Sequence, residues 1–217
     1  MTGLDERINI RIVSEDDISD IIQLQKESFP IMAKDGVIWQ EHHLKSHINV
    51  FPEGQLCAEL AGKIVASASS LVTRLTPEYK DHTWKEATAF GMFTNHTFEG
   101  DSLYGADIST HPDSRGIGIA TKLYNARKDL AIRLNLRRMI AGGRLFNYCE
   151  YAEKMTPQEY AEKVVRSELN DPVLSFQLKN GFRFIKILPN YMRDARSLNY
   201  ASFIEWKNTK YMPRKVI

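Results

Sequence analysis

A glycine-rich turn between a strand pattern and a helix pattern is the feature that most constrains how this chain can fold. Residues 103–110 are rich in strand-forming side chains and end at His111 and Pro112, while apolar residues recur at helical spacing over 118–134. The turn between them reads Arg115, Gly116, Ile117, Gly118, Ile119, Ala120. Backbone N–H groups of such a turn, together with roughly half a positive charge at the helix start, attract phosphate. The sequence therefore predicts a phosphate-binding turn at residues 115–120.

Other glycine turns have different requirements. A dinucleotide-binding turn has a third glycine where this chain has Thr121, and a nucleotide P-loop needs Gly-Lys followed by Ser or Thr, which is absent here. A plain tight turn before a helix stays open on spacing alone. A nucleotide-binding enzyme is disfavoured, and a failure of ATP and NAD to protect the protein against thermal unfolding would exclude it.

The rest of the chain alternates strand and helix patterns. We predict strands at 8–13, 55–60, 63–72, 103–110, 138–141, 182–188 and 201–206. We predict helices at 14–29, 39–50, 118–134, 172–179 and 146–169, the last with a break and restart at 155–157. Residues 73–100 read as a long ordered loop with one helical turn. Hairpins in the first half and β-α-β units in the second predict an α/β chain with a mixed sheet and helices on both faces.

Composition narrows the class of protein. The 217 residues are 43% hydrophobic, which suits a single domain over 1–217 with a helical insertion at about 146–169. A net charge of +2 gives no strong field for nucleic acid or an anionic membrane. No apolar run approaches the ~20 residues of a membrane helix, and the N-terminus has no signal-peptide core. With Cys57 and Cys149 in no metal or disulfide spacing, we expect a cytoplasmic protein.

Two segments resemble a known family. Residues 111–120 resemble motif A of the GNAT superfamily of acetyltransferases, whose pattern is met by Arg115, Gly118 and Ala120. Residues 170–182 resemble the motif B helix of the same family, which ends in Lys-x-Gly-Phe. The resemblance implies the GNAT fold, a mostly antiparallel, splayed mixed sheet flanked by helices, and a bacterial N-acetyltransferase with acetyl-CoA as acyl donor.

A narrower resemblance concerns one GNAT subgroup. Residues 51–55, 82–86, 94–96 and 171–178 are similar to GNAT domains that occur N-terminal to nitrilase-type carbon-nitrogen hydrolases. The chain has no room for that second domain, so it is a free-standing relative or a fragment. The alternative to an enzyme is a non-catalytic acyl-CoA-binding regulatory module that partners such a hydrolase.

Motif A implies the CoA contacts. The strand before it splays from its neighbour in this family, which assigns pairing with the pantetheine arm to Ile108, Ser109 and Thr110. The pyrophosphate is then expected on the N–H groups of Arg115, Gly116, Ile117, Gly118, Ile119 and Ala120. Asn170 matches an asparagine near the pantetheine or the thiol.

The catalytic residues are less fully matched. The acceptor amine attacks the thioester directly in a ternary complex. Its ammonium form has a pKa of ~10.4, so it must lose a proton before it can attack. Asp107 is the expected base. Gln177 stands where the family has a tyrosine that protonates the leaving thiolate, and a Gln side chain cannot act as an acid. We expect Tyr148 to be the acid, with Tyr104 and Tyr151 as alternatives, unless the thiolate leaves without a proton donor.

Some features leave their partners open. The acceptor is a small-molecule or protein amine, and a homodimer is compatible with the sequence. The histidines match no metal-ligand spacing, so no metal is expected. The insertion at 146–169 is a solvated amphipathic helix pair, or a lid, acceptor wall or dimer surface.

Overall fold

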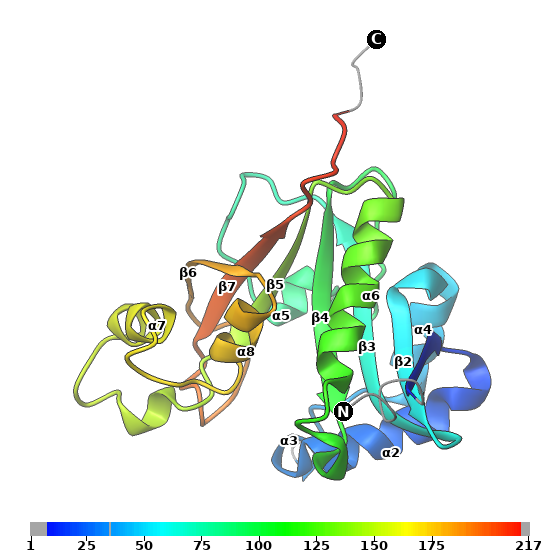
Figure 1. Cartoon of the computed structure of the whole chain (residues 1–217), viewed down its shortest axis with the longest axis horizontal. Helices are drawn as coiled ribbons and strands as arrows, with labels where there is room; N and C mark the ends of the chain where they lie inside the picture. Colours follow the sequence, from blue (N-terminus) through cyan, green and yellow to red (C-terminus); the bar gives the residue numbers. More distant parts are fainter. Residues whose placement is uncertain (1–7, 35, 214–217) are drawn as a thin grey trace.

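Seven strands form one mixed sheet in the computed structural model, which describes residues 8–34 and 36–213 (Figure 1). The strand order is β1-β2-β3-β4-β5-β7-β6. The strands are β1 Ile8–Ile12, β2 Gln55–Leu60, β3 Lys63–Thr73, β4 Ser102–Thr110, β5 Arg138–Arg144, β6 Arg183–Leu188 and β7 Ala201–Lys207. β4 and β5 run parallel, and the other neighbouring strands pair antiparallel. The predicted mixed, mostly antiparallel sheet is confirmed.

Helices cover both faces of this sheet, as predicted. They are α2 Ile18–Ser28, α3 Pro30–Lys34, α4 Glu41–Val50, α5 Trp84–Ala87, α6 Ile119–Arg133, α7 Pro157–Val165 and α8 Leu174–Lys179, with single 3-10 turns η1 Glu15–Asp17, η2 Pro52–Gly54, η3 Pro112–Ser114 and η4 Tyr148–Glu150. Leu71 and Tyr104 pack with α2 and α4, whereas the next residues in register, Val72 and Leu103, pack with α6, α7 and α8 on the other face. Alternation of side chains along β3 and β4 thus supplies two cores.

Two predicted boundaries are wrong. β5 does not stop at Ala141 but continues through Gly142 and Gly143, because both glycines pair with β7. Only the second half of the predicted helical region 146–169 is an α-helix, α7. The first half folds into η4 and turns, because the N–H of Asn147 is bonded to the carboxylate of Asp171 and Tyr148 is buried in the core.

The sheet divides at its centre. β4 and β5 pair only from Ser102–Arg138 to Gly105–Ala141, and beyond that point both strands continue without pairing to each other. The β3–β4 register shifts at the same level, so that Ala106 is an extra, bulged residue. In Figure 1 the two strands diverge toward the end of the molecule where α6 begins. We call the space between the diverging ends of β4 and β5 the wedge.

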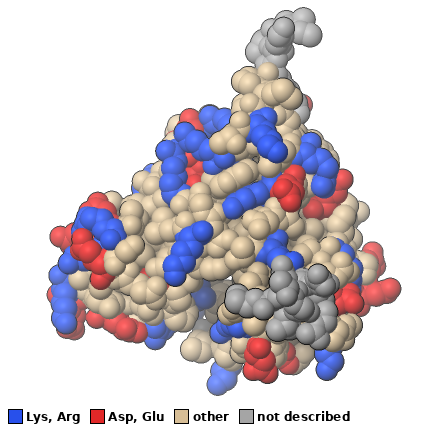
Figure 2. Space-filling model, in the orientation of Figure 1, with Lys and Arg blue, Asp and Glu red and all other residues tan. Residues whose placement is uncertain are grey.

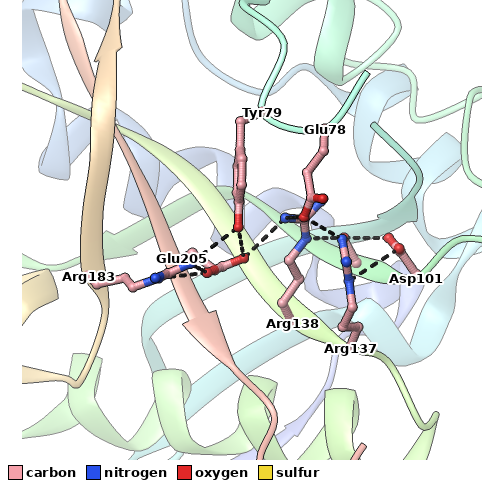
Figure 3. A network of polar contacts seen from close by, with 8 residues as sticks. Glu78, Tyr79, Asp101, Arg137, Arg138, Arg183 and Glu205 are labelled. Carbon is pink, nitrogen blue, oxygen red and sulfur yellow. Dashed lines mark hydrogen bonds and ion pairs between the residues drawn. The ribbon is translucent and has the colours of Figure 1, made fainter. Parts of the chain in front are cut away.

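A buried ion pair holds the loop before α5 against the sheet (Figure 3). The side chains of Arg138 on β5 and Glu205 on β7 are each 1% exposed, and their N–O distance is 3.1 Å. Glu205 also accepts hydrogen bonds from Tyr79 (2.8 Å) in that loop and from Arg183 on β6. Burial by itself would raise the pKa of Glu205, but these hydrogen bonds outweigh it and hold the pKa below its ordinary value.

The surface carries both signs of charge. Figure 2 shows Lys and Arg spread over the face in view, with Asp and Glu among them, mainly toward its margins. Within residues 8–34 and 36–213, no helix combines the length and apolar character needed to cross a membrane.

Candidate active site

A cavity of about 420 Å³ occupies the wedge. Its walls come from α2, α3, α4, α5, β4, β5, α6, α8 and the segments that follow α3, α5 and β6. The lining residues include Gln25, Phe29, Met32, Val37, Trp39, His43, Trp84, Phe90, Asp107, Ile108, Arg127, Gly142, Gly143, Arg144, Gln177 and Tyr191. The cavity therefore joins residues that are distant in sequence at the point where the sheet divides.

Asp107 is the carboxylate at this point, one residue beyond the bulge in β4. It accepts hydrogen bonds from the amide of Gln25 (2.9 Å) and the hydroxyl of Ser109 (2.9 Å). Gln25 is itself fixed, because its amide oxygen accepts from the N–H of Trp39 (2.8 Å). Burial raises the pKa of Asp107, and its hydrogen bonds and the charge of Arg127 offset this only in part. A carboxylate with a raised pKa in a cleft is suited to proton transfer.

Arg127 fixes the shape of the wedge from beneath. This α6 side chain is 2% exposed and donates to the main-chain oxygens of Ser69 (2.7 Å) and Asp107. These contacts join β3 and β4 at their register shift. Trp84 supports the same bulge from the other side, since its indole N–H donates to the carbonyl of Ala106 (3.0 Å).

The predicted phosphate-binding turn, residues 115–120, is largely exposed and lies between the end of β4 and the start of α6. Gly116 and Gly118 have φ of +80° and +90°, in the left-handed region that favours glycine. Gly118 precedes α6, whose first turn leaves N–H groups without helical partners. The guanidinium of Arg115 folds back onto the carbonyls of Thr110 (3.2 Å) and Ser28 (3.1 Å). Arg115 thereby ties the turn to β4 and α2 and leaves its backbone facing solvent.

The three strand residues predicted to contact the pantetheine arm, Ile108, Ser109 and Thr110, have different surroundings. Ile108 lines the cavity, whereas Ser109 is fully buried and bonds Asp107. Thr110 pairs with Ala66 of β3. On the β5 side, the pairing of β4 ends at Gly105, so main-chain groups beyond it are available to a ligand that enters the wedge.

Gln177 lines the cavity and has an unpaired polar atom in its side chain. Its side chain on α8 is 5% exposed, and its amide oxygen accepts no hydrogen bond from the part of the chain that the structure describes. It fits closely over β5, where a Cβ at Gly143 would clash with it. A buried carbonyl oxygen needs a donor, and the amide N–H of a pantetheine arm is of that chemistry. The wedge, the turn and Gln177 together fit an acyl-CoA.

Tyr148 and Asn170 are not part of the cavity lining. The Tyr148 hydroxyl donates to the carbonyl of Met155 (3.1 Å), and the ring packs against Tyr160 in the core. Asn170 is exposed and precedes Asp171, whose carboxylate caps α8. The buried contacts of Tyr148 place it away from any thioester in the wedge, which argues against it as the acid.

Two tyrosines line the cavity, Tyr124 on α6 and Tyr191, and sequence reasoning gave neither a role in the site. Tyr191, in the loop between β6 and β7, is fully buried and its hydroxyl contacts that of Tyr104 (2.8 Å). Neither periodicity nor a motif marks position 191. The aromatic wall was missed too: Trp39 and Trp84 face each other at 5.3 Å between ring centroids, and each comes from a segment without functional spacing.

In the ranges 8–34 and 36–213, no three His, Cys, Asp or Glu side chains gather in a way that could hold a metal ion. The functional candidates are therefore groups of the wedge: the carboxylate of Asp107, the buried guanidinium of Arg127, the amide of Gln177 and the tyrosines Tyr124 and Tyr191.

Comparison with known proteins gives consistent relatives. The sequence model of the Acetyltransferase (GNAT) family matches residues 18–148. The chain is 41% identical over 206 residues to the Bacillus subtilis protein "Uncharacterized N-acetyltransferase YkwB", covering 95% of this chain and 91% of that protein. It is 48% identical over 217 residues to "Probable hydrolase YhcX" of the same organism, and spans 99% of this chain but only 41% of that protein.

Solved structures share the fold. The loading GNATL domain of CurA from Lyngbya majuscula superposes with a TM-score of 0.79 at 21% identity, covering 92% of this chain and 97% of that one. The GphF GNAT-like decarboxylase in complex with isobutyryl-CoA gives 0.74 at 16% identity, covering 92% and 98%. For yncA from Salmonella typhimurium with acetyl-CoA the values are 0.58 and 16%, covering 97% and 99%.

Proposed function

Because this chain belongs to the GNAT acetyltransferase family and is an acyltransferase, we propose that it transfers an acetyl group from acetyl-CoA to a primary amine. Attack is direct, in a ternary complex of donor, acceptor and protein. The observation that carries the proposal is the carboxylate of Asp107, held by Gln25 and Ser109 inside a cavity at the point where β4 and β5 part.

Acetyl-CoA enters the wedge from the end at which α6 begins. Its pantetheine arm pairs with the β4 edge at Ile108, Ser109 and Thr110 as an added strand, and an amide N–H of the arm donates to the unpaired oxygen of Gln177. The pyrophosphate binds the N–H groups of residues 115–120, where the partial positive charge of the helix start favours it. Two fold neighbours were solved with acetyl-CoA or isobutyryl-CoA, which supports an acyl-CoA as donor.

The amine meets the thioester next to Asp107. An ammonium group of pKa near ~10.4 is electrostatically favoured beside the carboxylate, and Asp107 then takes the proton that blocks attack. The aromatic side chains of Trp39 and Trp84 give the acceptor side an apolar wall. An amine with a compact apolar body matches this lining.

The longer relative bears on the natural context. The chain matches only 41% of the protein named a probable hydrolase, so its GNAT region accounts for less than half of that protein. We propose that the matched part is an acetyltransferase-type domain of the kind fused to nitrilase-type hydrolases, and that hydrolysis belongs to the remainder. A purely regulatory acyl-CoA-binding role in such a partnership is the alternative that the following experiment addresses.

The test is Asp107→Asn, which keeps the size of the side chain and removes the base. We expect turnover of acetyl-CoA with an amine to fall about 10²- to 10⁴-fold, the range for a general base, while the Kd for CoA stays within about threefold. Thiol release measures the first quantity and calorimetry the second. Tight CoA binding by the wild-type protein without turnover of any amine would support the regulatory alternative instead.

A further inference from the structure

Three buried side chains form a hydrogen-bonded series that leads away from the wedge. The hydroxyl of Tyr191, on the cavity wall, contacts the hydroxyl of Tyr104 at 2.8 Å. The Tyr104 hydroxyl contacts Nε2 of His82 at 3.0 Å, and Nδ1 of His82 contacts the carbonyl of Lys80 at 3.0 Å. Tyr104 and Tyr191 are 0% and 2% exposed, and His82 is 5% exposed. Burying three polar groups costs free energy unless each of their hydrogen bonds is made. Each donor in the series must therefore face an acceptor.

The carbonyl of Lys80, at the far end of this hydrogen-bonded series, fixes the direction of each hydrogen bond in it. A carbonyl only accepts, so Nδ1 of His82 carries the hydrogen that bonds Lys80. Burial lowers the pKa of His82, which keeps the ring neutral and leaves Nε2 as an acceptor. Tyr104 therefore donates to His82, and Tyr191 donates to Tyr104. The oxygen of Tyr191 also faces the main chain of Gly142, and its remaining lone pair can accept a proton from the wedge, so at rest this hydrogen-bonded series is set to receive one.

Tyr191 lies where the reaction is proposed to occur. Its hydroxyl lies against Gly142, one residue beyond the last β4–β5 pair at Gly105 and Ala141, and a Cβ at Gly142 would clash with the ring and the hydroxyl. Asp107 lies on the opposite arm of the wedge, two residues beyond Gly105. A thioester in the wedge would thus have the carboxylate on one side and the Tyr191 hydroxyl on the other.

We propose that Tyr191 is a catalytic residue that takes a proton from the attacking nitrogen and returns it to the departing sulfur, with Tyr104 and His82 as its relay. This rests on the proposed acetyl transfer. Tyr191 would then protonate the leaving thiolate, which the amide of Gln177 cannot do and from which the buried contacts of Tyr148 remove its hydroxyl.

The proton transfers balance. The neutral amine nitrogen forms a bond to the thioester carbon, and its surplus proton passes to the oxygen of Tyr191. The Tyr191 hydrogen moves to Tyr104, and the Tyr104 hydrogen moves to Nε2 of His82, which becomes an imidazolium. As the C–S bond breaks and the electron pair goes to sulfur, the same three transfers run in reverse. The products are the amide and the free thiol of CoA, and His82 is neutral again.

Kinetics of hydroxyl-deletion variants test the relay. Tyr191→Phe and Tyr104→Phe should each lower kcat about 10- to 100-fold with KM for acetyl-CoA within about threefold, the lower part of the range for proton-transfer groups. The double variant should lose no more than either single one, since both changes interrupt one chain. Tyr200→Phe is the matched control. Tyr200 is a partly buried tyrosine that does not belong to the proposed relay, and this variant should keep wild-type kcat.

A second measurement is independent of variants and of their folding. In ¹⁵N-labelled wild-type protein, long-range ¹H–¹⁵N spectra should show His82 with its hydrogen on Nδ1. A hydrogen on Nε2 would reverse the wiring and overturn the relay, as would a Tyr191→Phe variant with unchanged kcat or losses that add in the double variant. If the wild-type protein acetylates no amine in a broad panel, the proposed function itself fails and the relay fails with it. An active wild type with fully active variants rejects the relay alone.

Discussion

Asp107 owes its properties to groups that three different elements bring to one carboxylate. Gln25 comes from α2, Ser109 from β4 and Arg127 from α6. Burial raises its pKa, and the donors oppose that rise by stabilising the ionised form. The carboxylate therefore works as a base only above its raised pKa, and activity should fall as the pH drops through that value.

The pH profile should respond to the donor on α2. Gln25→Met removes an N–H that stabilises the charged form, so the pKa of Asp107 should rise further. The acidic limb of kcat/KM should move up by about one pH unit, as expected for loss of one hydrogen bond to a charged group. Gln23→Met is the control, because Gln23 lies on the same helix but bonds the exposed Glu27. A limb that stays in place in Gln25→Met would show that Asp107 is not the titrating base.

Sequence reasoning reached some site residues and not others for a clear reason. Asp107 and Ile108 were predicted because they lie at fixed distances before a recognisable turn, and both line the cavity. Tyr191 and Trp39 come from loops, where no spacing reports what faces the wedge. No motif marks Tyr148, and its hydroxyl donates to the carbonyl of Met155.

The elements themselves followed from side-chain patterns. β2, β3 and α6 have periodic apolar residues and clear boundaries, and their predicted ranges agree with the structure within about a residue. β5 could not be bounded, because its two glycines look like a strand end and are instead required by Tyr191 and Gln177 packed over them. The first half of 146–169 has helical spacing but is held in turns by tertiary contacts.

The turn before α6 can be tested with a pair of glycines. Gly118→Ala puts a side chain at φ +90° with open space around it, so the cost is backbone strain of about 1–2 kcal/mol rather than a clash. Because this strain distorts the turn, the Kd for CoA should rise about tenfold by calorimetry.

Gly62→Ala is the matched control. Gly62 has φ +75° and equally open surroundings, but it lies in the β2–β3 hairpin. This variant should lose comparable stability and keep wild-type CoA affinity. Equal effects of the two changes on CoA binding would refute a specific role for the turn at residues 115–120.

At the scale of the whole molecule, two halves of a divided sheet must keep a fixed separation for the wedge to exist. The halves are joined through the short β4–β5 pairing, and the Arg138–Glu205 pair lies at the closed end of that pairing (Figure 3). The same network anchors Tyr79, in the loop that leads to His82 and Trp84. The buried charges therefore support the site from a distance.

Arg138→Met should be strongly destabilising. It leaves the buried carboxylate of Glu205 without one of its cations, a change that costs about 3–5 kcal/mol in buried pairs. Denaturant unfolding measures the loss. Arg166→Met, which breaks an exposed pair with Glu168, should leave stability unchanged within error. Equal stability of the two variants would mean that the network does not hold the sheet together.

The proposed reaction of the wedge is transfer of an acetyl group from acetyl-CoA to an amine. The most direct measurement is release of free CoA thiol from acetyl-CoA by the wild-type protein against a panel of primary amines, with mass detection of the product. We expect thiol release that depends on the amine and matches the acetylated amine one for one, as the proposed transfer requires. Thiol release that no amine accelerates, from a protein that binds CoA, would contradict it.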